Sequence, residues 1–293
     1  MGADICGFFE NVTEDLCIRW IEVGAFYPFC RNHNDEESKD QDPVILGEKV
    51  VEVYKSLLNI RYFLLPYLYT LFYNSHTRGQ PVIRPLLFDF PTDEETLHED
   101  RQFLWGKALM IIPVLEKNAD VVEVYFPRAT WYDYYTGMKV VTTGQKYLLD
   151  APLGKINLAL RGGNIIPAQE AAQTTTVSRN NPFHLLVALS EDGEADGDLY
   201  WDDGECQDPV QNGAYNLIRF TAKKQSIMTS VIRKGYMTTM EMSIVWIYGV
   251  VKAPSRVTIN SFPATYQYDT ETKLLKIVLR DVSLLHENLL LWI

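Results

Sequence analysis

Basic charge is scarce in this sequence, and it has no long apolar run. The 293 residues include 27 Lys and Arg against 38 Asp and Glu, a formal net charge of −11. Because nucleic-acid-binding proteins neutralise phosphates with basic side chains, this balance argues against a nucleic-acid partner. The longest apolar stretch, Tyr62 to Tyr73, contains Pro66 and is shorter than the roughly 20 residues of a membrane-spanning helix. We therefore expect no membrane segment, and the first residues lack the basic and apolar regions of a signal peptide.

Cysteine is also rare, and its spacing does not suggest a metal site. The four cysteines are Cys6, Cys17, Cys30 and Cys206. None belongs to a CxxC pair or to a zinc-type cluster with histidine. Cys6 and Cys17 bracket a short loop that a disulfide could close, and the loop carries an N-glycosylation sequon at Asn11. Together these two features favour the secretory pathway.

Several motifs of nucleotide, metal and nucleophile chemistry are missing as well. The sequence contains no P-loop, GxGxxG, HExxH or GxSxG. A Ser/His/Asp triad cannot be assembled from the residue order. We expect no metal and no organic cofactor.

The first 90 residues alternate between strand-like and helix-like patterns. ADICGFF reads as a buried strand, and Thr13 is placed to cap a helix that runs toward Phe26. A longer helical pattern extends from about Leu46 to His76. Pro66 should kink or break this helix, and Gly79 should end it. PVIRPLLFDFP then reads as another strand. This order predicts α/β architecture, in which helical crossovers connect parallel strands.

After Pro91 the sequence pattern changes to short runs rich in β-branched residues, which are separated by Gly, Pro or Asn. One series extends from LMIIPVL to GGNIIP, and a second from FHLLVALS to LLLWI. Such spacing is typical of antiparallel β-sandwiches. The expected fold class is therefore α/β plus all-β, with two β modules after the α/β part.

Two places near the N-terminus carry candidate ligand-binding side chains. Asp4 lies at the end of the first strand run, the edge that carries the active site in βα barrels, although it also suits a turn cap. Arg31 and His33 follow the first helix, where their donors suit hydroxyl-rich ligands. Favourable charge at a helix C-terminus explains the same two residues slightly better.

The acidic stretch EDGEADGDLYWDDGE invites a calcium interpretation. Counted from Asp192, acids fall at positions one, three and five, with Gly197 at six and Asp203 at twelve. The flanking runs are strands, however, and Asp replaces the bidentate Glu of an EF-hand. Hairpin turns at Asp192-Gly193 and Asp203-Gly204 account for the glycines more simply, so we expect no calcium site.

Three stretches near the N-terminus are distinctive: GADICGF, CIRWIEVGAFYPFCRNHN and QDP. In these stretches the sequence resembles glycoside hydrolase family 31, especially its intestinal α-glucosidases of the maltase-glucoamylase and sucrase-isomaltase kind. Four later stretches agree with this resemblance and occur in the same order as in the family: RPLLFDFP, YFPRATWYDYYTG, INLALRGGNIIPAQE and LYWDDGE. The resemblance implies the C-terminal part of a (β/α)8 barrel over residues 1–85. It implies a proximal β-sandwich over 86–165 and a distal β-sandwich over 166–293.

The resemblance also assigns roles to individual residues. It implies that Asp4 and His33 line the subsite for the nonreducing glucose, that Phe8 is an aromatic at the pocket rim, and that Cys6 pairs with Cys17. The implied substrates are α-glucoside oligosaccharides, and the implied location is the secretory pathway or the outer face of the plasma membrane.

One departure from the family pattern bears on activity. Retaining hydrolases need two carboxylates about 5–5.5 Å apart, a nucleophile and a general acid/base. In the family these occupy WxDMNE-type and GDN-type motifs that precede GADICGF, and neither motif occurs in these residues. We therefore expect the nucleophile and the acid/base upstream of Met1, no catalytic residue in this chain and no activity from it alone. The alternative is a noncatalytic product whose β-sandwiches bind carbohydrate or protein.

Overall fold

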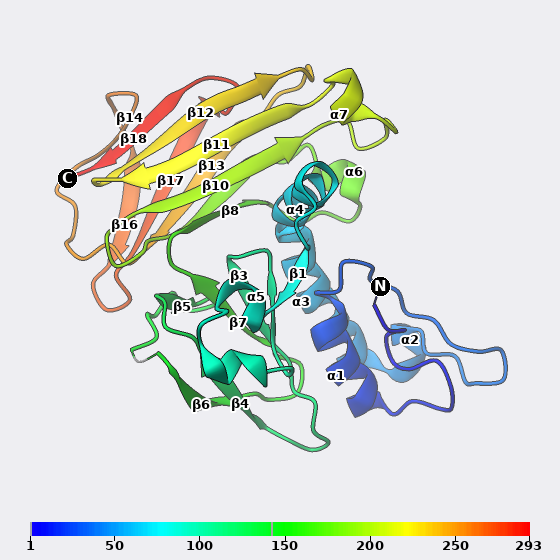
Figure 1. Ribbon diagram of the computed structural model, residues 1–293. Helices are drawn as coiled ribbons and strands as arrows, with labels where there is room; N and C mark the ends of the chain where they lie inside the picture. Colours follow the sequence, from blue (N-terminus) through cyan, green and yellow to red (C-terminus); the bar gives the residue numbers. More distant parts are fainter. Residues whose placement is uncertain (1, 142) are drawn as a thin grey trace. The chain divides into compact units, whose positions relative to one another are not determined.

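The computed structural model describes residues 2–141 and 143–293, which divide into two compact units. Of these residues, the first unit comprises 2–62, 82–128 and 143–159, and the second comprises 63–81, 129–141 and 160–293. Figure 1 shows helices mainly in the N-terminal part and strands in the rest. This agrees with the predicted change from α/β to all-β texture. Among the described residues, no helix is both long and apolar enough to cross a bilayer.

The first unit combines helices with short antiparallel strands. Its helices are α1 (Glu14–Gly24), α2 (Pro43–Leu46), α3 (Glu48–Phe63, whose last residue falls in the second unit), α5 (Leu86–Asp89) and the 3-10 helix η1 (Glu94–Leu97). Its strands are β1 (Ile83–Pro85), β2 (Phe103–Trp105), β3 (Leu109–Ile112), β4 (Val121–Phe126) and β6 (Gln145–Asp150). β1, β2 and β3 pair antiparallel in sequence order, and β4 pairs antiparallel with β6. β7 (Asn157–Arg161) crosses the division between the units.

The helix boundaries follow the signals in the sequence. Thr13 caps α1 as predicted, because its hydroxyl accepts the Leu16 amide at 3.3 Å. The long helical pattern is interrupted at Pro66, as predicted: α3 ends at Phe63, and α4 (Leu65–Arg78) has Pro66 in its first turn. Proline fits there because the first turn has no backbone acceptor for its missing N–H. Gly79 ends α4 in the left-handed conformation, with φ of 66°.

Two strand predictions in this region were wrong. ADICGFF forms no regular strand; among residues 2–141 and 143–293 its only β-pairing is a parallel bridge between Ile5 and Asn32. In PVIRPLLFDFP only Ile83–Pro85 is extended, and the next four residues form α5. A short apolar run fits a strand or a buried helical turn equally well, so periodicity could not separate the two.

The second unit contains an 11-stranded sheet with α4 packed against it. The sheet order is β15-β14-β18-β12-β11-β10-β8-β9-β13-β17-β16. Its strands are β8 (Asn164–Gln169), β9 (Phe183–Ala188), β10 (Ala195–Trp201), β11 (Asn216–Lys223), β12 (Ser226–Lys234), β13 (Glu241–Tyr248), β14 (Val257–Ile259), β15 (Phe262–Pro263), β16 (Thr265–Asp269), β17 (Leu274–Ser283) and β18 (Asn288–Trp292). The unit also contains β5 (Trp131–Asp133), α6 (Thr175–Ser178) and α7 (Pro209–Asn212). β8 runs across residue 165, where we placed a domain boundary; the predicted boundaries stay predictions.

The core of this sheet follows the alternation of its strands. Along β17, Leu275 and Ile277 are fully buried, while Val278 and Arg280 face outward. Each such side chain stabilises the fold by about 1.5–3 kcal/mol when buried. The two runs that bound the second β series, FHLLVALS and LLLWI, become β9 and β18.

The pairing differs from the expectation in two respects. The sheet is mixed rather than purely antiparallel, because β10 pairs parallel with β8 and β13 pairs parallel with β9. The turn at Asp192-Gly193 joins β9 to β10, but β8 lies between these strands, so it is not a hairpin turn. Asp203-Gly204 instead begins the longer connection that contains α7. Gly193 and Gly204 adopt the positive φ that turns require.

Candidate functional site

Two segments of the first unit run side by side and carry the predicted sugar-binding residues. Ile5 donates its amide to the Arg31 carbonyl at 2.9 Å, and Asp35 donates its amide to the Phe8 carbonyl at 3.1 Å. The two segments are parallel at the Ile5–Asn32 bridge. Residues 4–8 and 31–35 therefore lie together, although α1 separates them in the sequence.

Asp4 is held by an arginine from the neighbouring segment. Arg31 donates from Nε at 3.0 Å and from Nη2 at 2.6 Å, both to Oδ1 of Asp4. Oδ2 has no hydrogen-bond partner among residues 2–141 and 143–293. About a quarter of the Asp4 side chain is exposed, so this oxygen is available to a hydroxyl donor. The ion pair fixes the carboxylate while leaving one acceptor open.

His33 and Phe8 form the other side of this group. Their ring centroids are 5.6 Å apart with the planes at 47°. His33 is exposed, and in the described part of the chain neither ring nitrogen has a hydrogen-bond partner. Phe8 also packs edge-on against Phe9 at 4.7 Å. An imidazole with free nitrogens beside an aromatic face offers both a polar and an apolar contact to a sugar.

A buried glutamine joins the two segments, and the sequence did not identify it. Gln41 is 4% exposed, and its Nε2 donates to the carbonyls of Ile5 and Gly7 at 3.1 and 3.2 Å and to Asn32 Oδ1 at 2.8 Å. Asn32 in turn donates to the Gln41 carbonyl at 3.0 Å and to the Tyr54 hydroxyl at 3.3 Å. These bonds place Asp4 and His33 on a common framework. The one feature of the sequence that pointed to Gln41 was its place in the QDP motif, for which no role was predicted.

A disulfide and a tyrosine anchor the first segment to the helices. Cys6 is bonded to Cys17 on α1, as predicted. Closing a loop of this size stabilises the fold by about 3 kcal/mol in the chain-entropy model. The Tyr54 hydroxyl lies 3.2 Å from Sγ of Cys6 and 3.4 Å from Sγ of Cys17. Burial raises the pKa of Tyr54, which keeps this hydroxyl protonated.

The turn before the second segment is held by Arg61 of α3. Its Nη1 donates to the carbonyls of Ala25 and Tyr27, each at 2.7 Å, and its Nη2 donates to the Pro28 carbonyl at 3.2 Å. Burial lowers the pKa of Arg61, but guanidinium remains charged in proteins. A charged donor bound to three carbonyls fixes the backbone that leads into Arg31 and His33.

We assign neither the nucleophile nor the general acid/base to the residues gathered here. The nucleophile and the general acid/base are expected upstream of Met1, and Met1 itself lies outside the described residues. Their position therefore stays a prediction, and the side chains gathered around Asp4 and His33 are considered as binding groups alone.

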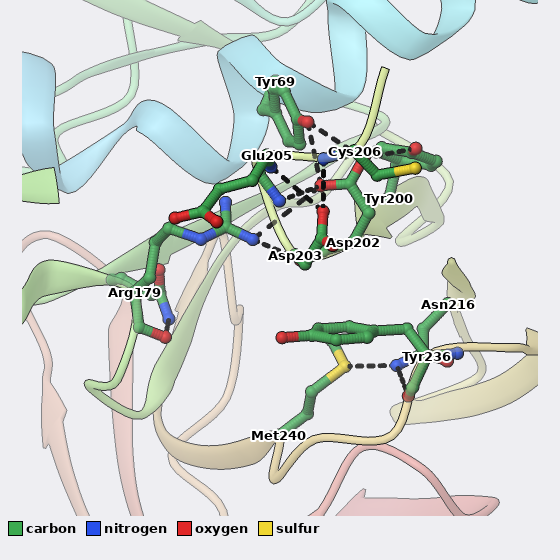
Figure 2. A network of polar contacts seen from close by, with 12 residues as sticks. Tyr69, Arg179, Tyr200, Asp202, Asp203, Glu205, Cys206, Asn216, Tyr236 and Met240 are labelled. Atoms are coloured by element: carbon green, nitrogen blue, oxygen red, sulfur yellow. Dashed lines mark hydrogen bonds and ion pairs between the residues drawn. The ribbon is translucent and has the colours of Figure 1, made fainter. Parts of the chain in front are cut away.

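The LYWDDGE stretch contributes a separate polar cluster in the second unit (Figure 2). Asp202 is 1% exposed. Its carboxylate accepts the Tyr69 hydroxyl at 2.8 and 2.9 Å, the Tyr200 hydroxyl at 2.6 Å and the Gly204 amide at 2.9 Å. Burial, together with the hydrogen bond to Asp202, raises the pKa of both tyrosines. Both carboxylate oxygens of Asp202 already accept hydrogen bonds from the protein, so we interpret this cluster as structural.

Arg179 completes the same cluster. It donates to the Asp202 carbonyl, and its guanidinium lies 3.9 Å from the centroid of the Trp201 ring. Asp203, by contrast, is exposed, and within the described part of the chain it accepts only the backbone amides of Glu205 and Cys206 in the turn that follows it. In the described residues, no group of three or more His, Cys, Asp or Glu side chains could hold a metal ion.

The glycosylation candidate Asn11 is exposed, and its Oδ1 accepts the Lys39 amide at 2.9 Å. Its Nδ2, the atom that would carry a glycan, has no hydrogen-bond partner among the described residues. Modification of Asn11 stays a prediction.

Comparison with known proteins identifies relatives of both units. Residues 1–71 match the "Glycosyl hydrolases family 31 TIM-barrel domain", and residues 79–166 match the "Glycosyl hydrolase family 31 C-terminal domain". The chain is 45% identical over 287 residues to intestinal sucrase-isomaltase of Oryctolagus cuniculus, which covers 94% of this chain and 16% of that protein. It is 43% identical over 299 residues to lysosomal alpha-glucosidase of Mus musculus, which covers 94% of this chain and 31% of that protein.

A solved structure agrees with these sequence matches. The Tris-bound glucosidase II alpha subunit superposes with a TM-score of 0.91 at 28% identity, over 99% of this chain and 34% of that one. The chain thus spans between about a sixth and a third of the length of these relatives.

Proposed function

Because the chain belongs to glycoside hydrolase family 31, we propose that it supplies part of the glucose-binding subsite of a retaining α-glucosidase. The whole protein would hydrolyse terminal α-linked glucose from oligosaccharides. The observation that carries this proposal is the pairing of residues 4–8 with residues 31–35, which gathers Asp4, His33 and Phe8 at one place. No catalytic carboxylate is assigned within these residues.

In this proposal the gathered side chains bind the sugar without breaking its bonds. Oδ2 of Asp4 accepts a hydrogen bond from a sugar hydroxyl, while Arg31 holds Oδ1 and keeps the carboxylate oriented. The His33 imidazole donates to a neighbouring hydroxyl. Phe8 offers its ring face to the C–H face of the sugar. Cleavage requires two further carboxylates, and the family's motifs for them are absent from this sequence.

Binding to this subsite can be followed through the histidines, of which the chain has five. We expect titration with maltose to shift the side-chain NMR resonances of His33, and Asp4→Asn to weaken this response strongly. Asp40→Asn changes an exposed aspartate of the nearby loop and should leave the response unchanged. A maltose titration that leaves the His33 resonances unmoved contradicts the proposal.

The activity of the isolated chain provides a second test. We expect no turnover of maltose or of a nitrophenyl α-glucoside, because Asp4 and His33 bind but do not cleave. Turnover that Asp4→Ala abolishes would overturn this expectation.

We also propose how the domains of the family divide this chain. Residues 1–85 would be the C-terminal part of the catalytic (β/α)8 barrel, residues 86–165 a proximal β-sandwich and residues 166–293 a distal β-sandwich. The match of residues 1–71 to the family's barrel domain and of 79–166 to its C-terminal domain supports this division.

The cellular location proposed is the secretory pathway or the outer face of the plasma membrane. The Cys6–Cys17 disulfide and the exposed sequon at Asn11 support it, since both need an oxidising or luminal compartment. The named relatives include an intestinal and a lysosomal enzyme.

A further inference from the structure

A cavity of about 610 Å³ lies in the second unit, where the two ends of the 11-stranded sheet follow each other in the chain. β15 is the first strand of the sheet order and β16 the last, yet only Ala264 separates them in sequence. The cavity is lined by residues of β14, β15, β16 and β17 and by the turn before β18. Its volume falls within the range of roughly 300–1,000 Å³ that is usual for small-molecule sites.

One wall of the cavity is fixed by a pair of asparagines. Asn288 is 5% exposed, and its Oδ1 accepts Nδ2 of Asn260 at 2.9 Å. Its own Nδ2 donates to the carbonyls of Ser283 and His286 at 2.8 and 2.9 Å. Asn260 also accepts the Leu289 amide at 2.9 Å. The β14–β15 turn and the turn before β18 are therefore held together before any ligand arrives, which lowers the entropy cost of binding.

Four ionisable side chains around the cavity are not used by the fold. Arg280, Asp281, His286 and Glu287 are exposed, and their side chains make no hydrogen bond or ion pair among the described residues. Asp281 also has a φ of 56°, in the left-handed region that non-glycine residues seldom adopt. The β13–β17 register shifts at this end of β17. Conformations of this kind persist where surrounding structure enforces them and gather at functional sites.

Phe262 adds an apolar surface to these polar groups. It lines the cavity and is 73% exposed, so it contributes little to the core. Two carboxylates and one guanidinium do not favour an anion, and the described residues contain no cluster with enough ligands for a metal ion. An aromatic face with both donors and acceptors matches a neutral ligand rich in hydroxyl groups.

We propose that this cavity is a second carbohydrate site, which binds a short neutral oligosaccharide with Phe262 against a sugar face and Arg280 and Asp281 on its hydroxyls. The proposal does not depend on the subsite at Asp4 and His33, because its residues belong to the other unit.

Calorimetric titration of the full chain with maltotriose tests the site. The titration uses a background that carries Asp4→Ala and His33→Ala, so that loss of the first subsite cannot be mistaken for loss of this one. We expect the background protein to bind maltotriose, and Phe262→Ala or Asp281→Asn to raise Kd at least about tenfold, equivalent to about 1.4 kcal/mol. Phe72→Ala, which removes an exposed phenylalanine of α4, is the matched control and should bind like the background.

The variants should fold, because Phe262 is mostly exposed and asparagine tolerates the left-handed conformation of residue 281. Circular dichroism checks this. No heat of binding in the background protein, or binding that both cavity variants leave unchanged, overturns the proposal.

Discussion

Single buried polar side chains decide the local geometry in both units. Gln41 connects the backbone of Ile5 and Gly7 to Asn32, and it does so from a loop between two helices. A polar residue in a loop contributes no periodic pattern. The sequence therefore predicted the loop but not the contacts that Gln41 makes from it. Asp4, His33 and Phe8 were predicted because they belong to the recognisable stretches GADICGF and RNHN. The contacts that hold them depend on pairing that only the folded chain supplies.

Replacement of Gln41 should measure the strength of this framework. Gln41→Ala leaves the two carbonyls and Asn32 Oδ1 without their donor, and we expect the free energy of unfolding to fall by about 1–3 kcal/mol. Urea denaturation followed by circular dichroism gives the value. Gln267→Ala, at an exposed glutamine of β16, should change it by less than about 0.5 kcal/mol. Equal effects at the two positions would show that Gln41 has no special role.

His184 of β9 introduces a pH dependence. It is 4% exposed, its Nδ1 lies 3.1 Å from Ser243 Oγ, and Nε2 lies 3.6 Å from Glu170 Oε2. Phe63 and Trp246 pack against the ring, and Lys276 is the nearby cation. Burial lowers the pKa of His184 below its ordinary 6.5, although Glu170 opposes the shift. The unfolded chain therefore takes up a proton at this residue more readily than the folded chain does.

The sign of the effect follows from this difference. As pH falls below 6.5 toward the lowered pKa, the contribution of His184 to the free energy of unfolding should decrease, by at most about 1.4 kcal/mol per pH unit. Urea denaturation at a series of pH values should show a shallower acid slope for His184→Gln than for the wild type. His76→Gln, at an exposed histidine of α4, should keep the wild-type slope. A slope unchanged by His184→Gln would contradict the assignment.

At the scale of elements, α4 is attached to β10 by polar contacts as well as by packing. Tyr69 donates to Asp202, and the Thr70 hydroxyl accepts the Tyr200 amide at 3.0 Å. Tyr73 stacks on Tyr200 with ring centroids 4.3 Å apart. The sequence predicted both elements from their periodicity, and Pro66 and Gly79 predicted the limits of α4. It did not predict that they touch, because the two elements are far apart in the chain.

Asp202 and its neighbour provide a matched test of this attachment. Asp202→Ala leaves the Tyr69 and Tyr200 hydroxyls and the Gly204 amide without their acceptor, and we expect a loss of about 3 kcal/mol or more in unfolding free energy. Asp203→Ala alters the exposed adjacent carboxylate and should cost about 1 kcal/mol or less. Thermal unfolding of the two variants compares them directly, and similar losses would argue against a structural role for the buried carboxylate.

At the scale of the whole molecule, the second unit is assembled from three separate stretches of chain. Residues 63–81 and 129–141 belong to it together with residues 160–293. Composition located the β-rich region correctly, but it could not assign α4 to this unit. Linear sequence gives no indication of which distant segment completes a sheet. The parallel β8–β10 and β9–β13 pairs were missed for the same reason.

This organisation predicts the behaviour of a truncated protein. A fragment of residues 166–293 lacks α4, β5 and the first residues of β8, and its Tyr200 and Asp202 lose their partners in α4. We expect it to melt at lower temperature than the full chain and to bind the dye ANS, which reports exposed apolar surface. Comparison of the fragment with the full chain under identical conditions provides the measurement. A fragment as stable as the full chain would show that residues 166–293 fold independently.

The direct passage from β15 to β16 through Ala264 also has a consequence for self-association. Long, flat sheet edges recruit strands from other molecules, which leads to aggregation. In this sheet one terminal strand has two residues and the other has five, and a single residue joins them. Neither edge gives an incoming strand a long template. These short ends, one of which contains Pro263, should therefore help to keep the protein soluble at high concentration.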